Sequence, residues 1–493
     1  MSDPSAINIP IGVGLTSDLL YGLKASAPKS KSYRINVNPL NKNIFSGGDC
    51  AIFECPSGRP GSYLDNSATY LKFSVQCSST TACVSGGSGI YLDNSAYSFI
   101  QRVDTYHGAS LLESCAEYGQ LANYIMDTTL TQSDKAGLSA MVGTNYVNNY
   151  MPTGATYAQY GTQQAVQTAG DRSGMSLASV STANGISTAI PYTFTLPFFN
   201  SVIGVNASKC LPVGKLNSPV RLEVYWENND NAIYYGSSGA GAVWQLVNVE
   251  LVLTYIELND DIPHDPSVPM YISTKSWRNC SSFIPSSSSG EITTLLPFRF
   301  ASLTGIYCRF LNQLNAVQGV NATASYRKGS SINPNFSQVY FRCGSSIIPN
   351  KPIYLINGSL VGTGSEGYAE LMKSYHQLST SIGNTAITFP QYNVCATATQ
   401  GWNAPYAPGA KTAGVLDTCN NGFSLSIECE SFSNRSDTIL SGISTLNTQI
   451  FFTGVVNSGQ TTGGTAGSNI TAHFFAQYDS ILVLQDGQLS AKF

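Results

Sequence analysis

Val220-Arg-Leu-Glu-Val-Tyr-Trp226 alternates apolar with polar residues over most of its length. This period of two is typical of a strand with one face in a core and the other in solvent. Similar short runs recur along the chain, separated by Gly, Pro, Asn and Ser clusters that favour turns. The sequence therefore predicts a mainly β protein, and the irregular spacing of its strands favours a jelly-roll sandwich over a propeller.

The predicted strands fall into two groups of similar size. The first group also contains Tyr33–Val37, Tyr70–Gln76, Phe99–Tyr106, Tyr192–Leu196 and Val247–Leu258. The second group contains Met270–Thr274, Ile306–Phe310, Val339–Cys343, Ile353–Ile356, Phe423–Glu428, Ile450–Val456 and Ala472–Leu484. Two groups of strands of this size predict two sandwich domains in tandem.

The segment Asn259-Asp-Asp-Ile-Pro-His-Asp-Pro-Ser-Val-Pro269 separates the two groups. Proline cannot donate to a β ladder, so three prolines here predict a break between domains. A chain of 493 residues is also too long for one core, because single cores stop growing near about 250–300 residues. We therefore predict an N-terminal arm (1–31), a first jelly roll (32–259), a linker (260–269) and a second jelly roll (270–493).

Each half contains one predicted helix. Ser110-Leu-Leu-Glu113 has the pattern of a capping box, and apolar residues with helical period follow it, which predicts a helix over Ser110–Asp127. Tyr368, Leu371, Met372 and Tyr375 predict a second helix over Ser365–Leu378. Both apolar faces are interpreted as core, and the two helices are expected at equivalent places in the two domains.

The hexapeptide Tyr63–Ala68 recurs without change as Tyr91–Ala96, and both copies are expected to begin strands through Asp-Asn-Ser turn chemistry. Two long segments, Leu130–Ile190 and Asn384–Asn421, are rich in small and polar residues. Loops of this length inside compact domains are usually functional. We predict that both take part in contacts between subunits or crown an outer face, with a plain surface loop as the alternative.

Charged residues make up only 11% of the chain, against a usual share of about 25%. A surface with so little charge suits a protein that is packed against copies of itself, although a secreted, loop-rich β protein could share it. The 25 basic residues are scattered and the net charge is −4, which argues against direct nucleic-acid binding. No basic segment precedes an apolar run near the N-terminus, so no secretion signal is predicted, and no apolar stretch is long enough to span a membrane.

The twelve cysteines form no CxxC pair, which argues against a structural zinc site. We expect most to be free thiols. Pairing of Cys50 with Cys55, or of Cys77 with Cys83, stays open as an alternative.

Motifs for catalysis are missing from the sequence, which has no G-x-S-x-G elbow, no H-E-x-x-H and no P-loop. Gly362-Thr-Gly-Ser-Glu-Gly367 matches G-x-G-x-x-G, but no acidic residue lies between Glu370 and Asp417, so a Gly-rich turn into a helix is preferred to a dinucleotide site. The four histidines are His107, His264, His376 and His473. His107 is interpreted as a structural hydrogen-bonding group.

Two acidic clusters are candidate sites. Asp260, Asp261, His264 and Asp265 could ligate a cation, but they lie in a proline-rich segment where Asp is a common turn former. Glu113 and Glu117 would lie one helical turn apart, but capping already explains Glu113. No catalytic, cofactor-binding or metal-binding residue is therefore assigned, and no cofactor is predicted.

Several motifs taken together resemble the double jelly-roll major capsid proteins of the Polinton, adintovirus and virophage group of DNA viruses. They are Leu92–Glu113 and Thr131-Gln-Ser-Asp134 in the first half, and Leu296–Gly305, Leu440–Asn447 and Tyr478–Leu484 in the second. The motifs lie in both halves, so the resemblance covers most of the chain, and their order and spacing strengthen it.

The resemblance implies two eight-stranded jelly rolls, a homotrimer with a pseudo-six-fold outline, and an icosahedral shell in the virion. It also implies penton and minor capsid proteins as partners and a possible internal membrane nearby, with no catalytic residues. Two alternatives remain: a secreted or surface β-sandwich that binds carbohydrate or a receptor, and an enzyme such as a glycosidase. The enzyme would need a placed pair of carboxylates that the sequence does not offer.

Overall fold

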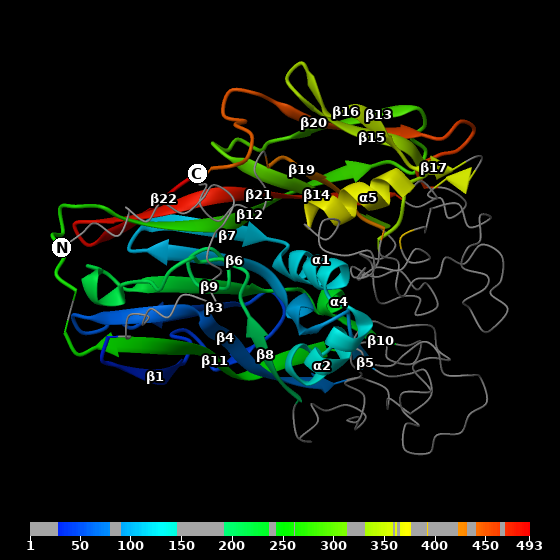
Figure 1. The fold of residues 1–493 in the computed structure, drawn as a ribbon. Helices are drawn as coiled ribbons and strands as arrows, with labels where there is room; N and C mark the ends of the chain where they lie inside the picture. Colours follow the sequence, from blue (N-terminus) through cyan, green and yellow to red (C-terminus); the bar gives the residue numbers. More distant parts are fainter. Residues whose placement is uncertain are drawn as a thin grey trace, which may run out of the picture.

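The computed structural model of the chain contains two β-sandwiches (Figure 1). It describes residues 28–78, 90–144, 192–235, 243–260, 262–312, 331–357, 360–361, 365–375, 392, 423–430, 440–463 and 469–493. No sheet in these ranges mixes strands from before and after residues 260–269.

The first sandwich has two facing sheets. One is ordered β1-β11-β4-β8, with β2 also paired to β11. Its strands are β1 (Ser30–Val37), β2 (Ile44–Phe45), β4 (Ser62–Ser78), β8 (Tyr192–Pro197) and β11 (Val243–Leu258). The other sheet is ordered β3-β9-β6-β7. Its strands are β3 (Cys50–Cys55), β6 (Ile100–His107), β7 (Ser110–Ala116) and β9 (Val220–Trp226).

The second sandwich repeats this plan. One sheet is ordered β12-β21-β14-β19, with β22 also paired to β21. Its strands are β12 (Met270–Ile284), β14 (Leu303–Asn312), β19 (Leu425–Glu428), β21 (Ile470–Gln485) and β22 (Gln488–Lys492). The other sheet is ordered β13-β20-β15-β16. Its strands are β13 (Glu291–Leu296), β15 (Phe336–Cys343), β16 (Ser346–Tyr354) and β20 (Ile450–Val456).

When the main strands of each sandwich are counted in chain order, strands with the same count hold the same position in the corresponding sheets. Each sandwich is therefore an eight-stranded jelly roll, and the predicted fold class is confirmed. All pairs are antiparallel; the longest ladder joins β12 to β21, from Met270↔Leu484 to Ile284↔Ile470. In Figure 1 the four sheets follow one another from the top of the view to the bottom, with the second jelly roll above the first. Two short ribbons complete the described strands: β5 (Ile90–Leu92) with β10 (Ile233–Tyr235), and β17 (Ile356–Asn357) with β18 (Leu360–Val361).

The helices lie in matching connections. α1 (Tyr118–Thr129) and α2 (Gln132–Val142) join β7 to β8, and α5 (Ser365–Ser374) lies between β16 and β19, the corresponding strands of the second jelly roll. The equivalent placement expected for the two helices is therefore confirmed. Within the described ranges, shorter helices are η3 (Ala96–Phe99), η5 (Val213–Lys215) and α4 (Asn229–Ala232).

The structure corrects the start of the first predicted helix. Ser110–Ala116 is the strand β7, paired with β6 across the turn at Gly108, and α1 begins only at Tyr118. The capping box lies instead at Thr131 and Asp134, where each side chain accepts the backbone N–H of the other residue. Part of the segment predicted as a long loop is thus α2; residues 145–190, and 384–421 apart from Tyr392, lie outside the described ranges.

The identical hexapeptides adopt different structures. Tyr63–Ala68 lies within β4, as expected for the beginning of a strand. Tyr91–Ala96 instead ends β5, turns at Asn94 with a φ of 78°, and enters η3. The expectation that both copies begin strands is therefore wrong for the second copy, which ends β5 and leads into η3, where Ser95 accepts the N–H of Tyr97.

The capping box predicts that truncating its N-cap side chain lowers the stability of the protein by a measurable amount. Thr131→Ala is expected to lower the free energy of unfolding by about 1 kcal/mol, since it removes the side-chain acceptor at the N-cap of α2. Ser110→Ala is the matched control and should have an effect near zero, because Ser110 is an exposed strand residue. Urea unfolding of both variants measures this, and an equal loss in both would contradict the assignment.

Candidate functional site at the junction of the two jelly rolls

The two jelly rolls meet where β7 of the first lies beside β12 and β22 of the second (Figure 1). Backbone groups cross this junction directly: Ser208 N–H donates to Ser273 O at 3.3 Å, and Asn217 N–H donates to Gly487 O at 2.9 Å. Both donors come from the connection between β8 and β9. The junction is thus built from a strand edge and a loop of the first jelly roll.

Apolar burial is continuous across the junction. Trp277, Tyr307, Phe475 and Leu489 of the second jelly roll belong to the same buried cluster as the first jelly-roll core. Contacts between mobile domains are usually smaller and more polar than this, so a shared core favours a fixed arrangement. The second jelly roll also has a separate core around Phe310.

Glu113 of β7 is the most deeply buried carboxylate of the junction, at 3% exposure. It accepts the Ser276 hydroxyl from β12 at 2.5 Å and the Ser201 backbone N–H at 2.8 Å, with the Asn200 amide at 3.3 Å. Burial raises the pKa of Glu113, and these hydrogen bonds oppose part of that rise. Glu113 therefore ties both jelly rolls to the β8–β9 connection.

An ion pair forms a second polar link. Arg309 of β14, whose side chain is 1% exposed, contacts Asp127 of α1 at 3.0 Å. Asp127 also accepts from Lys135 of α2 at 2.7 Å and from Asn94 at 3.1 Å. The Asp127 carboxylate of α1 therefore links α2 and the β5–η3 turn to a strand of the second jelly roll.

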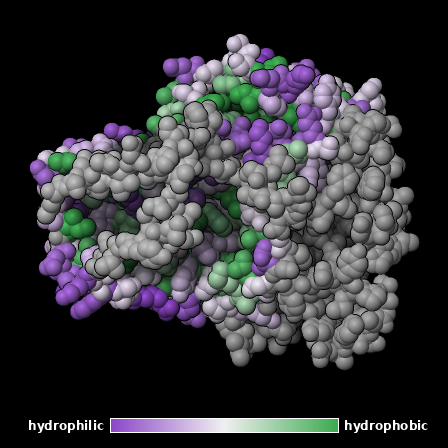
Figure 2. Space-filling model, in the orientation of Figure 1, coloured by the Kyte–Doolittle hydropathy of each residue, from purple (hydrophilic) through white to green (hydrophobic). Residues whose placement is uncertain are grey.

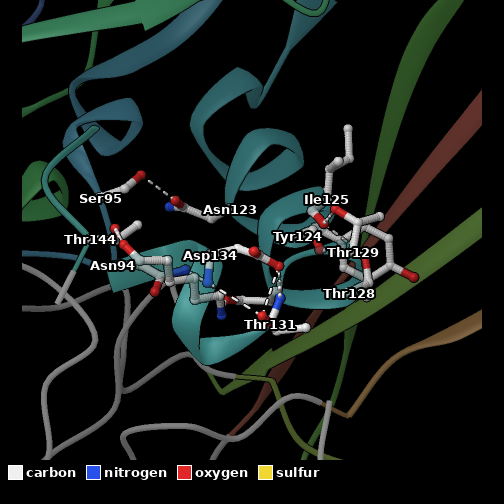
Figure 3. Close-up of polar contacts among 12 residues, drawn as sticks. Asn94, Ser95, Asn123, Tyr124, Ile125, Thr128, Thr129, Thr131, Asp134 and Thr144 are labelled. Atoms are coloured by element: carbon white, nitrogen blue, oxygen red, sulfur yellow. Dashed lines mark hydrogen bonds and ion pairs between the residues drawn. The ribbon is translucent and has the colours of Figure 1, made fainter. Parts of the chain in front are cut away.

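Hydrogen bonds of α1, of α2 and of the turn before η3 set the positions of the two helices, and Figure 3 shows those that join its labelled residues. Ser95 donates to Asn123 at 2.5 Å, which fixes the first half of α1 against the turn before η3. Thr128 and Thr129 donate back to the carbonyls of Tyr124 and Ile125, and the Thr131–Asp134 box then starts α2. The short elbow between the helices thus places Asp127 and Lys135 on the same side.

Aromatic rings fill the space beside this ion pair. Tyr124 of α1 lies 6.1 Å from Tyr307, 6.4 Å from Tyr375 and 6.5 Å from Phe475, measured between ring centroids. Such pairs contribute about 0.5–1.5 kcal/mol each beyond their buried area. The ring cluster joins α1 of the first jelly roll to three segments of the second.

Among the described histidines, His107 lies at the junction and bonds across it. Its Nδ1 accepts the backbone N–H of Leu489 in β22 at 3.2 Å, as expected of a structural hydrogen-bonding group. Burial lowers the pKa of His107, which favours the neutral ring that this acceptor role requires. His473 is buried in β21, His264 lies in the linker and His376 lies outside the described ranges.

Glu113 and Glu117 do not lie one turn apart on a helix, as the sequence had suggested. Glu113 lies in β7 and Glu117 is the N-cap of α1, with a φ of 52° and no side-chain cap hydrogen bond. Capping does not explain Glu113 as expected, because its partners are Ser276, Ser201 and Asn200. Those partners lie 87 to 163 residues away in the chain, so no local motif could reveal them.

The linker cluster shows turn chemistry where it is described. Asp265 accepts the backbone N–H and the hydroxyl of Ser267 at 3.0 and 2.8 Å, which lowers its pKa. Asp261 lies outside the described ranges, as do the first three residues of the Gly362–Gly367 motif. Across the residues that the structure describes, no group of three His, Cys, Asp or Glu side chains is arranged to hold a metal ion.

Cys55, Cys115 and Cys308 are buried free thiols. Cys50 and Cys55 are not bonded to each other, and Cys83 lies outside the described ranges. No helix among the described residues is both long and apolar enough to cross a membrane.

Solved structures match nearly the whole chain, whereas no protein-family model and no curated protein matches the sequence. A chain in the Sputnik virophage structure aligns with a TM-score of 0.57 and 12% identity, over 99% of this chain and 94% of that one. VP54 of the virus PBCV-1 aligns with a TM-score of 0.55 and 11% identity, over 96% and 98%. The mavirus major capsid protein aligns with a TM-score of 0.52 and 10% identity, over 100% and 95%.

The topology and these alignments together define a double jelly-roll protein. Among proteins of that fold, the chain is similar to the major capsid proteins of virophages and of PBCV-1, which confirms the resemblance seen in the sequence motifs at the level of the fold.

Glu113 gives the junction a testable pH dependence. Its folded pKa is raised, so folding favours the protonated form: this stabilisation is present below the unfolded value near 4.5 and is lost as pH rises through the folded pKa. Glu113→Gln cannot ionise, and its amide can donate to the Ser276 hydroxyl. We expect the variant to be more stable than the unmodified chain at pH 8, with a smaller difference at pH 4.

Denaturant unfolding at the two pH values measures this difference. Glu113→Ala is the contrasting variant, expected to lose about 1–3 kcal/mol at both pH values because Ser201 N–H and the Asn200 amide lose their acceptor. If Glu113→Gln were less stable at pH 8 than the unmodified chain, the predicted direction of the pH effect on stability would be wrong.

Proposed function

We propose that the chain is the major capsid protein of a DNA virus, a structural protein without catalytic activity that resides in the virion. The observation that carries the proposal is that two jelly rolls of identical strand order are fixed together in one chain and align over nearly its whole length with viral capsid chains. A shell subunit needs such rigidity, because neighbouring subunits must meet the same surfaces in every copy.

The capsomer of this proposal is a homotrimer. Three copies bring together six jelly rolls of similar outline, which gives a pseudo-six-fold unit that can tile an icosahedral lattice. Within each copy, the proposed division is an arm (1–31), two jelly rolls (32–259 and 270–493) and a linker (260–269), with Ser30 and Lys31 at the end of the arm already paired in β1. Penton and minor capsid proteins are the further partners that such a shell requires.

Light scattering coupled to size-exclusion chromatography tests the proposal on the full chain. The expected result is a particle with three times the mass of the chain, and electron microscopy should show a hexagonal outline. A stable monomer at all concentrations, especially one that binds glycans, would support a binding module and overturn the capsid proposal.

The trimer should survive high salt. Only 11% of the residues are charged, so contacts between copies rest mainly on apolar area and hydrogen bonds, which salt screens little. We expect the same trimer mass at low ionic strength and in molar NaCl, with dissociation in urea. Dissociation by salt alone would show that ion pairs hold the copies together.

A further inference from the structure

The two jelly rolls place equivalent sheet edges in different surroundings. In the first, β1 and β2 lie along the same side of β11, at Leu251–Leu258 and Leu246–Val247, and so form one edge. In the second, β12 lies along the corresponding side of β21. The edge made by β1 and β2 is therefore the counterpart of β12.

β12 is covered within the chain. Ser276 and Trp277 are 1% and 4% exposed, and the cover consists of β7 and the β8–β9 connection of the first jelly roll. The contacts include the Glu113–Ser276 hydrogen bond and the donation from Ser208 N–H to Ser273 O.

No strand among the described residues pairs with the outer side of the counterpart edge. Ser30 to Arg34 are all exposed, and the edge and the loop between β1 and β2 carry exposed apolar side chains. Tyr33, whose ring stacks on Tyr255, is 39% exposed, Leu40 62% and Ile44 54%. An edge strand with exposed apolar residues is a site that proteins normally cover or protect. We name Tyr33, Leu40 and Ile44 the open edge.

The second jelly roll carries the counterpart of the covering surface. The β6–β7 and β15–β16 hairpins both turn at a glycine of positive φ, Gly108 at 58° and Gly344 at 60°. Ser218, just before β9, lies beside the turn at Gly108. Thr448, just before β20, lies in the same way beside the turn at Gly344. β16 and the described part of the β19–β20 connection thus correspond to β7 and the β8–β9 connection.

This covering surface is also exposed and apolar. Ile347 is 37% exposed, Tyr354 56% and Leu446 46%, and Figure 2 shows apolar residues among polar ones at the surface of the second jelly roll. Pro349 and Pro352 interrupt the hydrogen-bonding capacity of β16, so the surface suits side-chain packing better than strand addition. We name Ile347, Tyr354 and Leu446 the covering face.

We propose that the open edge of one copy docks against the covering face of a second copy, so that the contact between subunits repeats the junction inside each chain. The inference rests on the proposed trimer and specifies its surfaces. Such a contact is heterologous, because different patches meet, and it forms a ring when the rotation closes. Three copies then present alternating internal and intermolecular junctions around the ring.

Charge substitutions at exposed positions test the surfaces without disturbing either core. Ile44→Asp places a charge on the open edge and Ile347→Asp places one on the covering face. Each variant is expected to be monomeric and to keep the circular-dichroism spectrum of the folded, unmodified chain. Leu295→Asp is the matched control: Leu295 is 50% exposed on β13, at the opposite edge of the sheet from β16, and this variant should remain trimeric.

Mixing the two monomeric variants gives the decisive result. Each retains one intact surface, so the mixture should form a heterodimer and no trimer, which mass photometry with one tagged variant can resolve. An unmodified trimer together with trimeric Ile44→Asp and Ile347→Asp variants would overturn these surfaces and leave the capsid proposal standing. An unmodified chain that is monomeric would overturn both.

Discussion

Asp127→Ala is expected to lower the free energy of unfolding by about 3 kcal/mol, because it removes a carboxylate from an arginine that is almost fully buried. Breaking one partner of a buried pair typically costs about 3–5 kcal/mol, and the 18% exposure of Asp127 places this case at the lower end. Asp127 also holds Lys135 and Asn94, so the loss should spread to α2 and the β5–η3 turn.

The measurement is urea unfolding of the purified variant, with Glu370→Ala as the matched control. Glu370 also lies on a helix and pairs with a lysine, Lys373 at 3.5 Å, but that lysine side chain is 47% exposed. Exposed pairs contribute about 0–1 kcal/mol, so the control should change little. Equal losses in both variants would show that burial of Arg309 does not set the cost.

A double-mutant cycle separates the pair from its surroundings. Arg309→Met alone removes the buried charge and leaves Asp127 with Lys135. If Arg309 and Asp127 interact as the geometry indicates, the double variant should lose less than the sum of the two single variants. Additive losses would mean that Asp127 acts mainly through the first jelly roll and does not lock the two domains together.

The sequence predicted the strands well because their signal is local. The alternation in Val220–Trp226 and the apolar run of Ile450–Val456 need only neighbouring residues, and both strands have the expected bounds. The prolines after Leu258 likewise predict a break from local chemistry alone. The similar number of such runs on each side of the break predicted two domains, whereas the order of the strands within each sheet is seen only in the structure.

The junction could not be predicted in the same way. Ser110-Leu-Leu-Glu113 satisfies a helix-start pattern, but Gly108 allows a tight turn and β6 offers a partner, so the segment forms β7. What decides the role of Glu113 is contact with Ser201 and Ser276, far along the chain. A tertiary environment of this kind overrides local propensity.

Arg309 was missed for a related reason. It lies in a strand whose neighbours are mostly apolar, and a buried arginine in such a run requires an acidic partner. That signal was available in the sequence. Its partner, Asp127 at the end of α1, could be assigned only from the packing of one jelly roll against the other.

Leu121→Asp is expected to prevent folding of the first jelly roll. Leu121 is 1% exposed on the inward side of α1, where the helix packs against η3 and β6. An unpaired carboxylate at this site would cost more than about 4 kcal/mol, a large share of the roughly 5–15 kcal/mol that stabilises a domain. Because Tyr124 and Asp127 lie on the same helix, its loss would also open the junction and leave the second jelly roll without its cover.

Soluble yield, circular dichroism and trimer mass report the outcome. Ala140→Asp makes a comparable change at an exposed position of α2 and should give folded trimer, which controls for added charge near the same elbow. Leu121→Met keeps the buried apolar volume and should also assemble. A soluble, trimeric Leu121→Asp variant would show that the inward face of α1 is not part of the core. In that case α1 could not be the support that holds Asp127 against Arg309.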